Sequence, residues 1–430
     1  MQHPPLAADG GRPLSVALLS YRSKPHCGGQ GVYVRHLSRE LVTLGHRVEV
    51  ISGPPYPELD EGVDLTPVPS LDLYREPDPF RVPWPKEFRT SIDVLEFAMM
   101  CTAAFPEPLT FSLRAYRLLK ARGQLPDVIH DNQTLGYGMM LMQRAGMPII
   151  ANVHHPITVD RELDLAATPW RRKLSKVRWY SFLRMQKRVI NAMPTLVTVS
   201  ENSYDDIVRD FEVDPRRMRV IPVGVEHDVF VPPALPRVPG RIVATASADH
   251  PLKGIVPLLE AVAKLRTERD VELVIVGKAN EGGAAARTIE RLGLEDCVRF
   301  VSGVSELELV GIFGSAQVGV VPSLYEGFSL PAIELMSCAT PLVATTAGAL
   351  PEVVGDAALS VPPGDTEALA RAIADVLDDD ELAARLGAAG RARVMERYTW
   401  QSVARQTVQW YRDYLGETVP HPTPVLHREH

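Results

Sequence analysis

The sequence predicts an α/β protein with two successive doubly wound domains, each organised around a parallel sheet. Short apolar runs typical of buried strands alternate with amphipathic, helix-like segments. This alternation runs in two series, which meet at a proline-rich junction at 232–239. The 430 residues also exceed one ordinary domain and fit two domains of roughly 200 residues each. Helices are expected on both faces of each sheet, because helical crossovers connect parallel strands.

The first series begins with a strand, a glycine-containing loop and a helix. The apolar run 14–20 predicts the strand, and apolar residues at helical spacing predict a helix over 32–44. The stretch 52–108 is rich in proline and aspartate, and it predicts a long functional or mobile loop. Further elements are expected as strands at 48–51, 127–130, 148–154 and 195–200 and as helices at 136–144 and 170–191.

The second series repeats the pattern beyond the junction. Its strands are expected near 241–246, 271–276, 298–301, 317–321 and 341–345. An amphipathic helix around 400–415 lies beyond this series, and the residues after it show no periodicity. The sequence therefore predicts a first domain at 1–231, a second at 232–398, a separate helix at 399–416 and a mobile tail at 417–430.

Composition excludes several classes of protein. Hydrophobic residues make up 45% of the chain and charged residues 23%, as in soluble globular proteins. A net charge of -7 gives no basic footprint for nucleic acid. The four cysteines have no paired spacing, which favours reduced thiols over a metal site or disulfides. The polar residues 1–13 do not resemble a signal peptide, and no apolar run could span a bilayer, so we expect a cytoplasmic protein.

Two glutamates eight positions apart, Glu326 and Glu334, stand in the run PSLYEGFSLPAIEL. The run predicts the end of a strand, a tight loop with Glu326, and a helix that begins near Pro331. Such a helix N-terminus favours acidic residues by itself, so the spacing alone is also compatible with a structural role. Two carboxylates beside exposed backbone N–H groups suit a ligand that is polyhydroxylated and anionic, such as a nucleotide sugar. The N–H groups expected to bind it belong to Gly327, Phe328, Ser329 and Leu330.

Two further features indicate a diphosphate site. Gly28, Gly29 and Gly31 lie between the first strand and the first helix, where N–H groups can approach phosphates closely. Their pattern differs from the dinucleotide-binding fingerprint, and on its own it is equally typical of an ordinary turn. Lys253 follows the first strand of the second series, so its charge adds to a helix N-terminus.

A histidine pair ends the strand expected at 148–154. His154 lies at the carboxyl end of this strand, where doubly wound sheets bind their ligands, and His155 follows it. A structural hydrogen bond is the alternative role for a histidine in such a loop. We favour a functional role for His154 and a structural role for His155.

Taken together, these motifs resemble those of the retaining glycosyltransferases of family 4, which have the GT-B fold. The resemblance implies that Glu326 contacts the transferred sugar, that Glu334 binds the ribose of the nucleotide, and that His154 also contacts the donor sugar. It further implies that Lys253 and the glycine loop lie at the diphosphate, and that the last helix crosses back onto the first domain. Family members usually carry an Arg where this chain has Ser247, which leaves the second phosphate contact open.

The resemblance implies a retaining transferase that moves a hexose from a UDP-glucose or GDP-mannose type of donor to an acceptor hydroxyl. The acceptor can be a glycan, a lipid-linked sugar or a small molecule. Lys253 and the N–H groups can stabilise the leaving diphosphate, so we expect neither a metal nor a cofactor. An epimerase of the same fold and a donor-binding regulatory protein are the alternatives. The oligomeric state is not indicated.

A basic segment at 170–188 raises the question of membrane contact. If this segment is one helix, a single stripe carries Lys173, Lys176, Tyr180, Arg184 and Lys187. Basic residues interleaved with aromatic residues suit the surface of an anionic membrane. A solvated helix face whose other side packs on the first domain is the alternative, and we favour it slightly.

Overall fold

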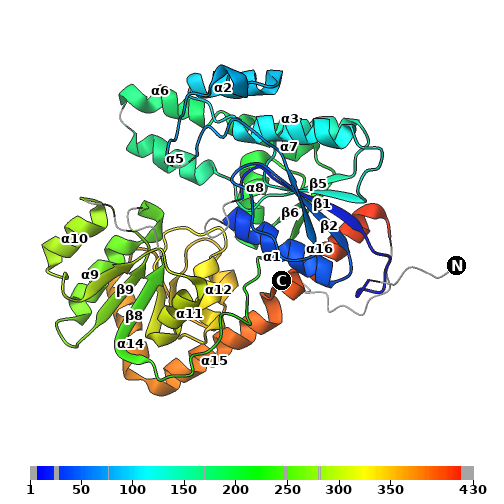
Figure 1. The fold of residues 1–430 in the computed structure, drawn as a ribbon. Coiled ribbons are helices and arrows are strands. Elements are labelled where there is room, and N and C mark those ends of the chain that lie inside the picture. The colour runs from blue at the N-terminus through cyan, green and yellow to red at the C-terminus, as the bar shows by residue number, and fades with distance from the viewer. Residues whose placement is uncertain are drawn as a thin grey trace. The chain divides into compact units, whose positions relative to one another are not determined.

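A computed structural model describes residues 7–23, 29–75, 77–168, 170–245, 250–278, 280 and 282–417 (Figure 1). The described chain divides into two compact units. Unit 1 holds the residues up to Thr198, Asp206–Ile221 and the residues from Val403 onward. Unit 2 holds Val199–Asp205 and Pro222–Ser402.

Unit 1 is built on a seven-stranded sheet with the order β3-β2-β1-β4-β5-β6-β7, and its neighbouring strands are parallel. The order reverses between β1 and β4, and doubly wound sheets bind ligands beside such a reversal. The strands are β1 (Ser15–Ser20), β2 (Arg47–Ser52), β3 (Val63–Pro67), β4 (Val128–Asn132), β5 (Ile149–Asn152), β6 (Leu196–Thr198) and β7 (Met218–Val220).

Amphipathic helices cover the sheet of unit 1. In the first of them, Val34, Leu37 and Leu41 follow helical spacing and are almost fully buried. The helices are α1 (Gly29–Thr43), α2 (Ser91–Cys101), α3 (Glu107–Lys120), α4 (Tyr137–Arg144), α5 (Thr158–Ala167), α6 (Trp170–Trp179), α7 (Phe182–Ala192), α8 (Glu201–Phe211) and α16 (Trp400–Leu415). The first residues of α8 and of α16 belong to unit 2, so each helix runs from one unit into the other.

The prediction of a loop over 52–108 was wrong, because this stretch contains β3, α2 and the start of α3. Helix α2 could not be recognised from the sequence, because the buried face of this helix carries acidic residues. Asp93 and Glu96 are buried, and both pair with Arg114 of α3. Apolar periodicity therefore does not mark the face of α2 that packs inward.

The helical residues predicted across 170–191 are confirmed, but they form two helices and not the single helix that the basic stripe requires. The helix breaks after Trp179, and α6 and α7 are separate elements. Lys176 Nζ and Tyr180 Oη lie 2.7 and 2.8 Å from Asp164 Oδ2, and Lys187 Nζ lies 3.1 Å from Glu212. The basic residues of this segment therefore do not form one continuous stripe.

The C-terminal helix α16 supplies part of the core of unit 1. Trp410 and Tyr411 are almost completely buried. Trp410 Nε1 donates a hydrogen bond to Thr195 Oγ1 at 3.0 Å, and Tyr411 Oη lies 2.6 Å from His130 Nδ1. Residues separated by more than 200 positions thus meet in one core.

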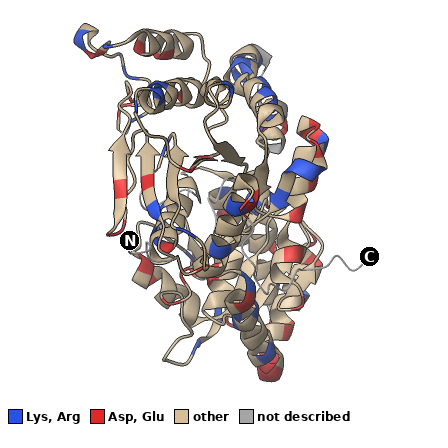
Figure 2. Cartoon of the chain, turned by 90° about the vertical axis from the view of Figure 1, so that its right-hand side faces the viewer, with Lys and Arg blue, Asp and Glu red and all other residues tan. Residues whose placement is uncertain are grey.

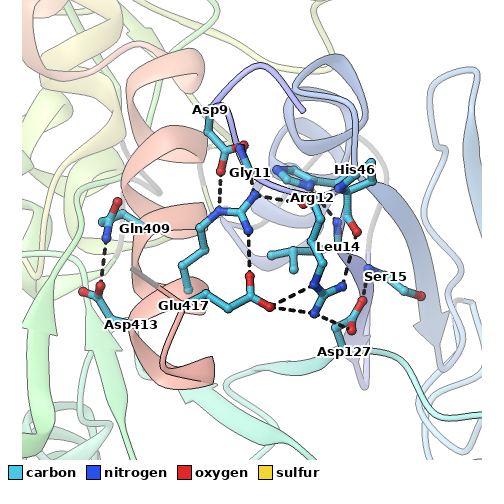
Figure 3. Close-up of polar contacts among 12 residues, drawn as sticks. Asp9, Gly11, Arg12, Leu14, Ser15, His46, Asp127, Gln409, Asp413 and Glu417 are labelled. Atoms are coloured by element: carbon cyan, nitrogen blue, oxygen red, sulfur yellow. Dashed lines mark hydrogen bonds and ion pairs between the residues drawn. The ribbon is translucent and has the colours of Figure 1, made fainter. Parts of the chain in front are cut away.

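An ion cluster ties α16 to the N-terminal segment before β1 (Figure 3). The Arg412 guanidinium is 1% exposed and binds the carboxylates of Asp9 and Glu417. Glu417 also binds Arg12, which binds Asp127 at 2.9 Å. Burial alone would raise the pKa of Asp9, but its hydrogen bonds with Arg412 and with the N–H of Gly11 outweigh burial and lower this pKa.

Unit 2 contains a six-stranded parallel sheet with the order β10-β9-β8-β11-β12-β13. The strands are β8 (Val238–Thr245), β9 (Glu272–Val276), β10 (Val298–Val301), β11 (Ala316–Val321), β12 (Leu342–Thr345) and β13 (Leu359–Val361). The helices are α9 (Ile255–Leu265), α10 (Ala284–Leu292), α11 (Glu306–Ser315), α12 (Leu330–Ser337), α13 (Leu350–Val354), α14 (Thr366–Asp378) and α15 (Asp380–Arg397). The prediction of two doubly wound α/β domains is confirmed.

Charge is spread over both units. Figure 2 shows basic and acidic residues interspersed along the described chain. Within that part of the chain, none of the helices combines the length and the apolar character needed to cross a membrane.

Candidate active site

Glu326, Lys253 and Ser323 form one hydrogen-bonded group in unit 2. Lys253 Nζ and Ser323 Oγ each lie 2.7 Å from the same carboxylate oxygen, Oε1 of Glu326. Ser323 is 2% exposed and Glu326 is 9% exposed, so the group is largely shielded from water. Two donors occupy Oε1, and among the described residues none binds Oε2. This oxygen is therefore available to accept a hydrogen bond from a ligand hydroxyl.

Close backbone packing fixes the position of Lys253. The 3-10 turn Pro251–Lys253 ends at Gly254, whose φ of 64° lies in the left-handed region. A Cβ at Gly254 would lie 1.8 Å from the carbonyl oxygen of Pro322, so only glycine fits there. Leu324 N donates to Leu252 O at 2.7 Å in the same contact. The segment with Lys253 and the loop with Glu326 are thus held against each other.

The loop after β12 holds the backbone of Glu326. Ala349 N donates a hydrogen bond to Glu326 O at 2.9 Å. A side chain at Gly348 would collide with this backbone, because its Cβ would lie 2.2 Å from Glu326 O. Thr345 Oγ1 donates to Ser323 O at 2.5 Å. Both residues of the Ser323–Glu326 pair therefore have a fixed main chain.

Residues at the start of α8 hold the carbonyl of Gly327. Ser200 Oγ and Ser203 Oγ donate to Gly327 O at 2.6 and 3.0 Å. The carboxylate of Glu352 accepts the N–H groups of Glu201 and Asn202 at 2.8 and 3.0 Å, and so caps the N-terminus of α8. These contacts orient the loop between Glu326 and α12.

The four residues 327–330 present the N-terminus of α12. Their N–H groups have no backbone acceptor within the described residues, as expected at the start of a helix. Ser329 adopts a φ of 100°, which is strained for a residue with a side chain. Phe328 anchors the loop through an edge-to-face contact with Tyr398, with ring centroids 5.7 Å apart. The N–H groups of this turn lie at the positive end of the helix dipole, which is a favourable place for an anion.

Glu334 lies one turn into α12 and is half-buried. Burial raises its pKa to about 7, and nearby Glu306 adds to this shift. Its carboxyl group is therefore poised to exchange a proton near neutral pH, unlike an ordinary solvated glutamate. A raised pKa of this kind is typical of functional sites.

His154 belongs to unit 1, two residues after β5. Its Nε2 lies 2.7 Å from Asn132 Oδ1, and its backbone N–H donates to Gln133 Oε1 at 2.6 Å. Burial lowers the pKa of His154 to about 3, and the charge of His155 adds to this effect. The ring is neutral at pH 7, and the amide oxygen can only accept, so Nε2 carries the proton. Nδ1 is then the acceptor of the ring.

The polar residues that position His154 were not identified from the sequence. They lie at the end of β4 and directly after it. There Gln133 has a φ of 54°, and its amide also donates to the carbonyl of His155 at 2.9 Å. Asp131 is fully buried and accepts the N–H groups of Thr134 and Leu135. Burial raises the pKa of Asp131 to about 7. The polar run HDNQ at the end of a buried strand was the signal that could have revealed this loop.

The glycine-rich segment differs from the loop that was expected. Gly29 and Gly31 lie in the first turn of α1, because the helix begins at Gly29 and not at residue 32. Their N–H groups are still among those that a helix leaves without internal partners. Asn132 Nδ2 donates to Gln30 O at 3.2 Å and connects this turn to the loop after β4. Gly28 and Ser247 lie outside the described residues.

The described residues contain no group of three or more His, Cys, Asp or Glu side chains that could hold a metal ion. Unit 2 combines a lysine, a carboxylate with one available oxygen, and a helix N-terminus. Such a set can bind a phosphorylated ligand and a sugar hydroxyl together. Within unit 1, His154 has a neutral imidazole with an acceptor nitrogen.

Two family descriptions match successive parts of the chain. Residues 27–229 match "Glycosyltransferase Family 4", and residues 234–393 match "Glycosyl transferases group 1". The "MMP alpha-(1->4)-mannosyltransferase" of Mycolicibacterium hassiacum is 55% identical over 407 residues, which cover 94% of this chain and 99% of that protein. The "Glycogen synthase" of Mycobacterium tuberculosis is 28% identical, with 95% and 97% covered. The structure of sucrose-phosphate synthase from Thermosynechococcus elongatus is similar with a TM-score of 0.71, 25% identity, and 93% and 99% of the two chains covered.

Proposed function

Because the chain belongs to glycosyltransferase family 4 and has the GT-B fold, we propose that it is a retaining hexosyltransferase with a nucleotide diphosphate sugar as donor. The observation that carries this proposal is the group formed by Lys253, Ser323 and Glu326 beside the N-terminus of α12. A cation and free N–H groups suit a diphosphate, and an available carboxylate oxygen suits a sugar hydroxyl.

We propose mannose as the transferred sugar and a hydroxyl of a glycan as the acceptor, joined by an α-(1→4) linkage. The support is the mannosyltransferase relative, which is 55% identical and matched over 99% of its length. A GDP-mannose type of donor follows from this proposal, with a UDP-glucose type as the alternative that the assay separates.

The proposed chemistry assigns separate tasks to the residues. Departure of the diphosphate builds negative charge on its oxygens, and Lys253 with the N–H groups of 327–330 stabilises that charge. Glu326 Oε2 accepts a hydrogen bond from the sugar while the sugar develops positive charge. Glu334 binds the ribose. For unit 1, we propose that Nδ1 of His154 accepts a hydrogen bond from a sugar hydroxyl. These cationic and N–H donors neutralise the leaving group by themselves, so we propose that catalysis needs no metal.

Three substitutions test the roles of these residues. Lys253→Ala and Glu334→Ala should each raise the KM for the donor, by roughly 10- to 100-fold, because each removes a charge-assisted contact present in both ground and transition states. Glu326→Ala should mainly lower kcat. Lys264→Ala, which removes a surface ion pair with Glu367, is the matched control and should change neither constant. An unchanged donor KM in both of the first two variants would contradict the assignment.

A direct assay tests the reaction itself. The protein is incubated with GDP-mannose or UDP-glucose, with and without a mannoside acceptor, and the release of nucleoside diphosphate is measured with and without EDTA. We expect release that depends on GDP-mannose and acceptor, resists EDTA, and yields an α-linked product by NMR. Acceptor-independent conversion of the donor would instead identify an epimerase, and donor binding without turnover would identify a regulatory protein.

A further inference from the structure

In helix α2 of unit 1, the usual distribution of side chains on a surface helix is reversed: acidic side chains face inward and apolar side chains are exposed. Its inward face carries Asp93 and Glu96, which pair with Arg114. Its exposed residues fall on one arc of about 120° at 3.6 residues per turn, and they are almost all apolar or weakly polar. They are Ser91, Val94, Leu95, Ala98 and Cys101.

Large apolar side chains extend this exposed face on the adjacent segments. Before α2, Phe80, Val82 and Trp84 are 59%, 76% and 71% exposed. On α6, Leu174 and Val177 are 84% and 43% exposed. We define the α2–α6 surface as the outer face of α2 together with residues 80–84 and the exposed residues of α6.

Contacts below the surface hold α2 and α6 together at one end of unit 1 (Figure 1). Trp179 at the end of α6 packs on Tyr74 and Phe105, with ring centroids 5.8 and 5.1 Å apart. Phe97 of α2 packs against the apolar cluster that contains Tyr74. The inward residues thus form a core of their own beneath the exposed apolar residues.

Basic residues surround the exposed apolar side chains. Among the side chains that the structure describes on these segments, acidic ones are few. Asp78 and Glu162 are exposed, whereas Glu87 pairs with Arg81 and Asp164 with Lys176, each at 2.7 Å. The exposed basic residues are Lys86, Arg89, Arg172, Lys173 and Arg178. A chain with a net charge of -7 therefore has a local positive excess where its apolar residues are exposed.

We propose that the α2–α6 surface docks on an anionic lipid bilayer. Exposed tryptophan and aliphatic side chains flanked by lysine and arginine match the boundary between lipid headgroups and acyl chains. Contact between two copies of this chain is disfavoured, because two-fold pairing would bring the same basic rims together. This binding surface replaces the single stripe expected on 170–188, and it does not depend on the proposed reaction.

The test is co-sedimentation of the full chain with vesicles. Vesicles of phosphatidylglycerol and phosphatidylcholine in equal parts should bind it, and phosphatidylcholine vesicles should not. Added salt should weaken the binding, because salt screens exposed charges. Arg172→Gln with Lys173→Gln should weaken it roughly 30-fold, from about 1 kcal/mol for each basic residue near the bilayer. Val94→Gln with Leu95→Gln should weaken it roughly tenfold, because apolar burial in the bilayer is lost.

Matched controls lie in unit 2. Leu307 is 77% exposed, and Leu307→Gln should leave binding unchanged, as should Arg371→Gln with Arg385→Gln on α14 and α15. Each variant is also analysed by thermal unfolding and by sedimentation velocity without lipid. The proposal is overturned if anionic vesicles fail to bind at low salt, if both vesicle types bind equally, or if the controls weaken binding as much. A dimer that dissociates upon the Val94 and Leu95 substitutions would assign the surface to self-association instead.

Discussion

Ser323→Ala should slow turnover although Ser323 need not touch the substrate. The serine hydroxyl donates to Glu326 Oε1 at 2.7 Å and is 2% exposed, so water does not readily replace it. A hydrogen bond to a charged group contributes about 1.5–3 kcal/mol. That hydrogen bond fixes the orientation of the Glu326 carboxylate. We therefore expect kcat to fall roughly 10- to 100-fold, since 1.4 kcal/mol corresponds to about a factor of ten.

The assay is steady-state kinetics with varied donor, because a positioning role and a binding role affect different constants. Lys253 still binds Glu326 in this variant, so the donor KM should change little. Ser305→Ala is the matched control, because Ser305 caps α11 and its loss should lower stability without affecting kcat. A normal kcat in Ser323→Ala, or an equal decrease in Ser305→Ala, would refute the argument that Ser323 positions Glu326.

Three other variants test the fold. Arg412→Met should destabilise unit 1 by about 3–5 kcal/mol in urea unfolding, because it leaves the carboxylate of Asp9, whose side chain is only 11% exposed, without its partner. By contrast, Arg216→Ala should have no effect, because the Arg216 side chain is 89% exposed. Burial lowers the pKa of His130 to about 3, so only the unfolded chain takes up this proton as the pH falls below about 6.5. Stability should therefore decrease as the pH falls from about 6.5 towards 3, and His130→Gln should reduce this slope by up to about 1.4 kcal/mol per pH unit. A slope that His130→Gln leaves unchanged would contradict this reasoning. Gly254→Ala should raise the donor KM and lower stability, because its Cβ would lie 1.8 Å from Pro322 O; wild-type values for both would show that the turn can relax.

The parallel sheets could be predicted because buried strands read as continuous apolar runs. The runs at 14–20 and 271–276, for example, correspond to β1 and β9. Helix α2 could not be predicted, because its buried face pairs Asp93 and Glu96 with an arginine more than 15 positions away. Nothing in a local pattern reveals such a partner.

The residues of the candidate site could be predicted where they lie in one continuous segment of the sequence. Glu326, Glu334 and the N–H groups of 327–330 come from one loop and one helix, and the structure places them there. Asn132, Gln133 and Ser323 were missed, because their roles arise only when separate loops meet. Retention, independence of metal and a cytoplasmic location stay predictions.

The placement of α16 has a consequence for how this chain can be divided or recombined. Trp410, Tyr411 and Arg412 complete the core of unit 1, although Pro222–Ser402 of unit 2 separate them in sequence from β7. A gene fragment that ends near residue 231 would encode the strands of unit 1 but leave Thr195, His130 and Asp9 without these partners. A chimaera with a foreign sugar-nucleotide domain should therefore keep its own last helix. Unit 1 is therefore a discontinuous domain, and its last segment is synthesised at the end of translation.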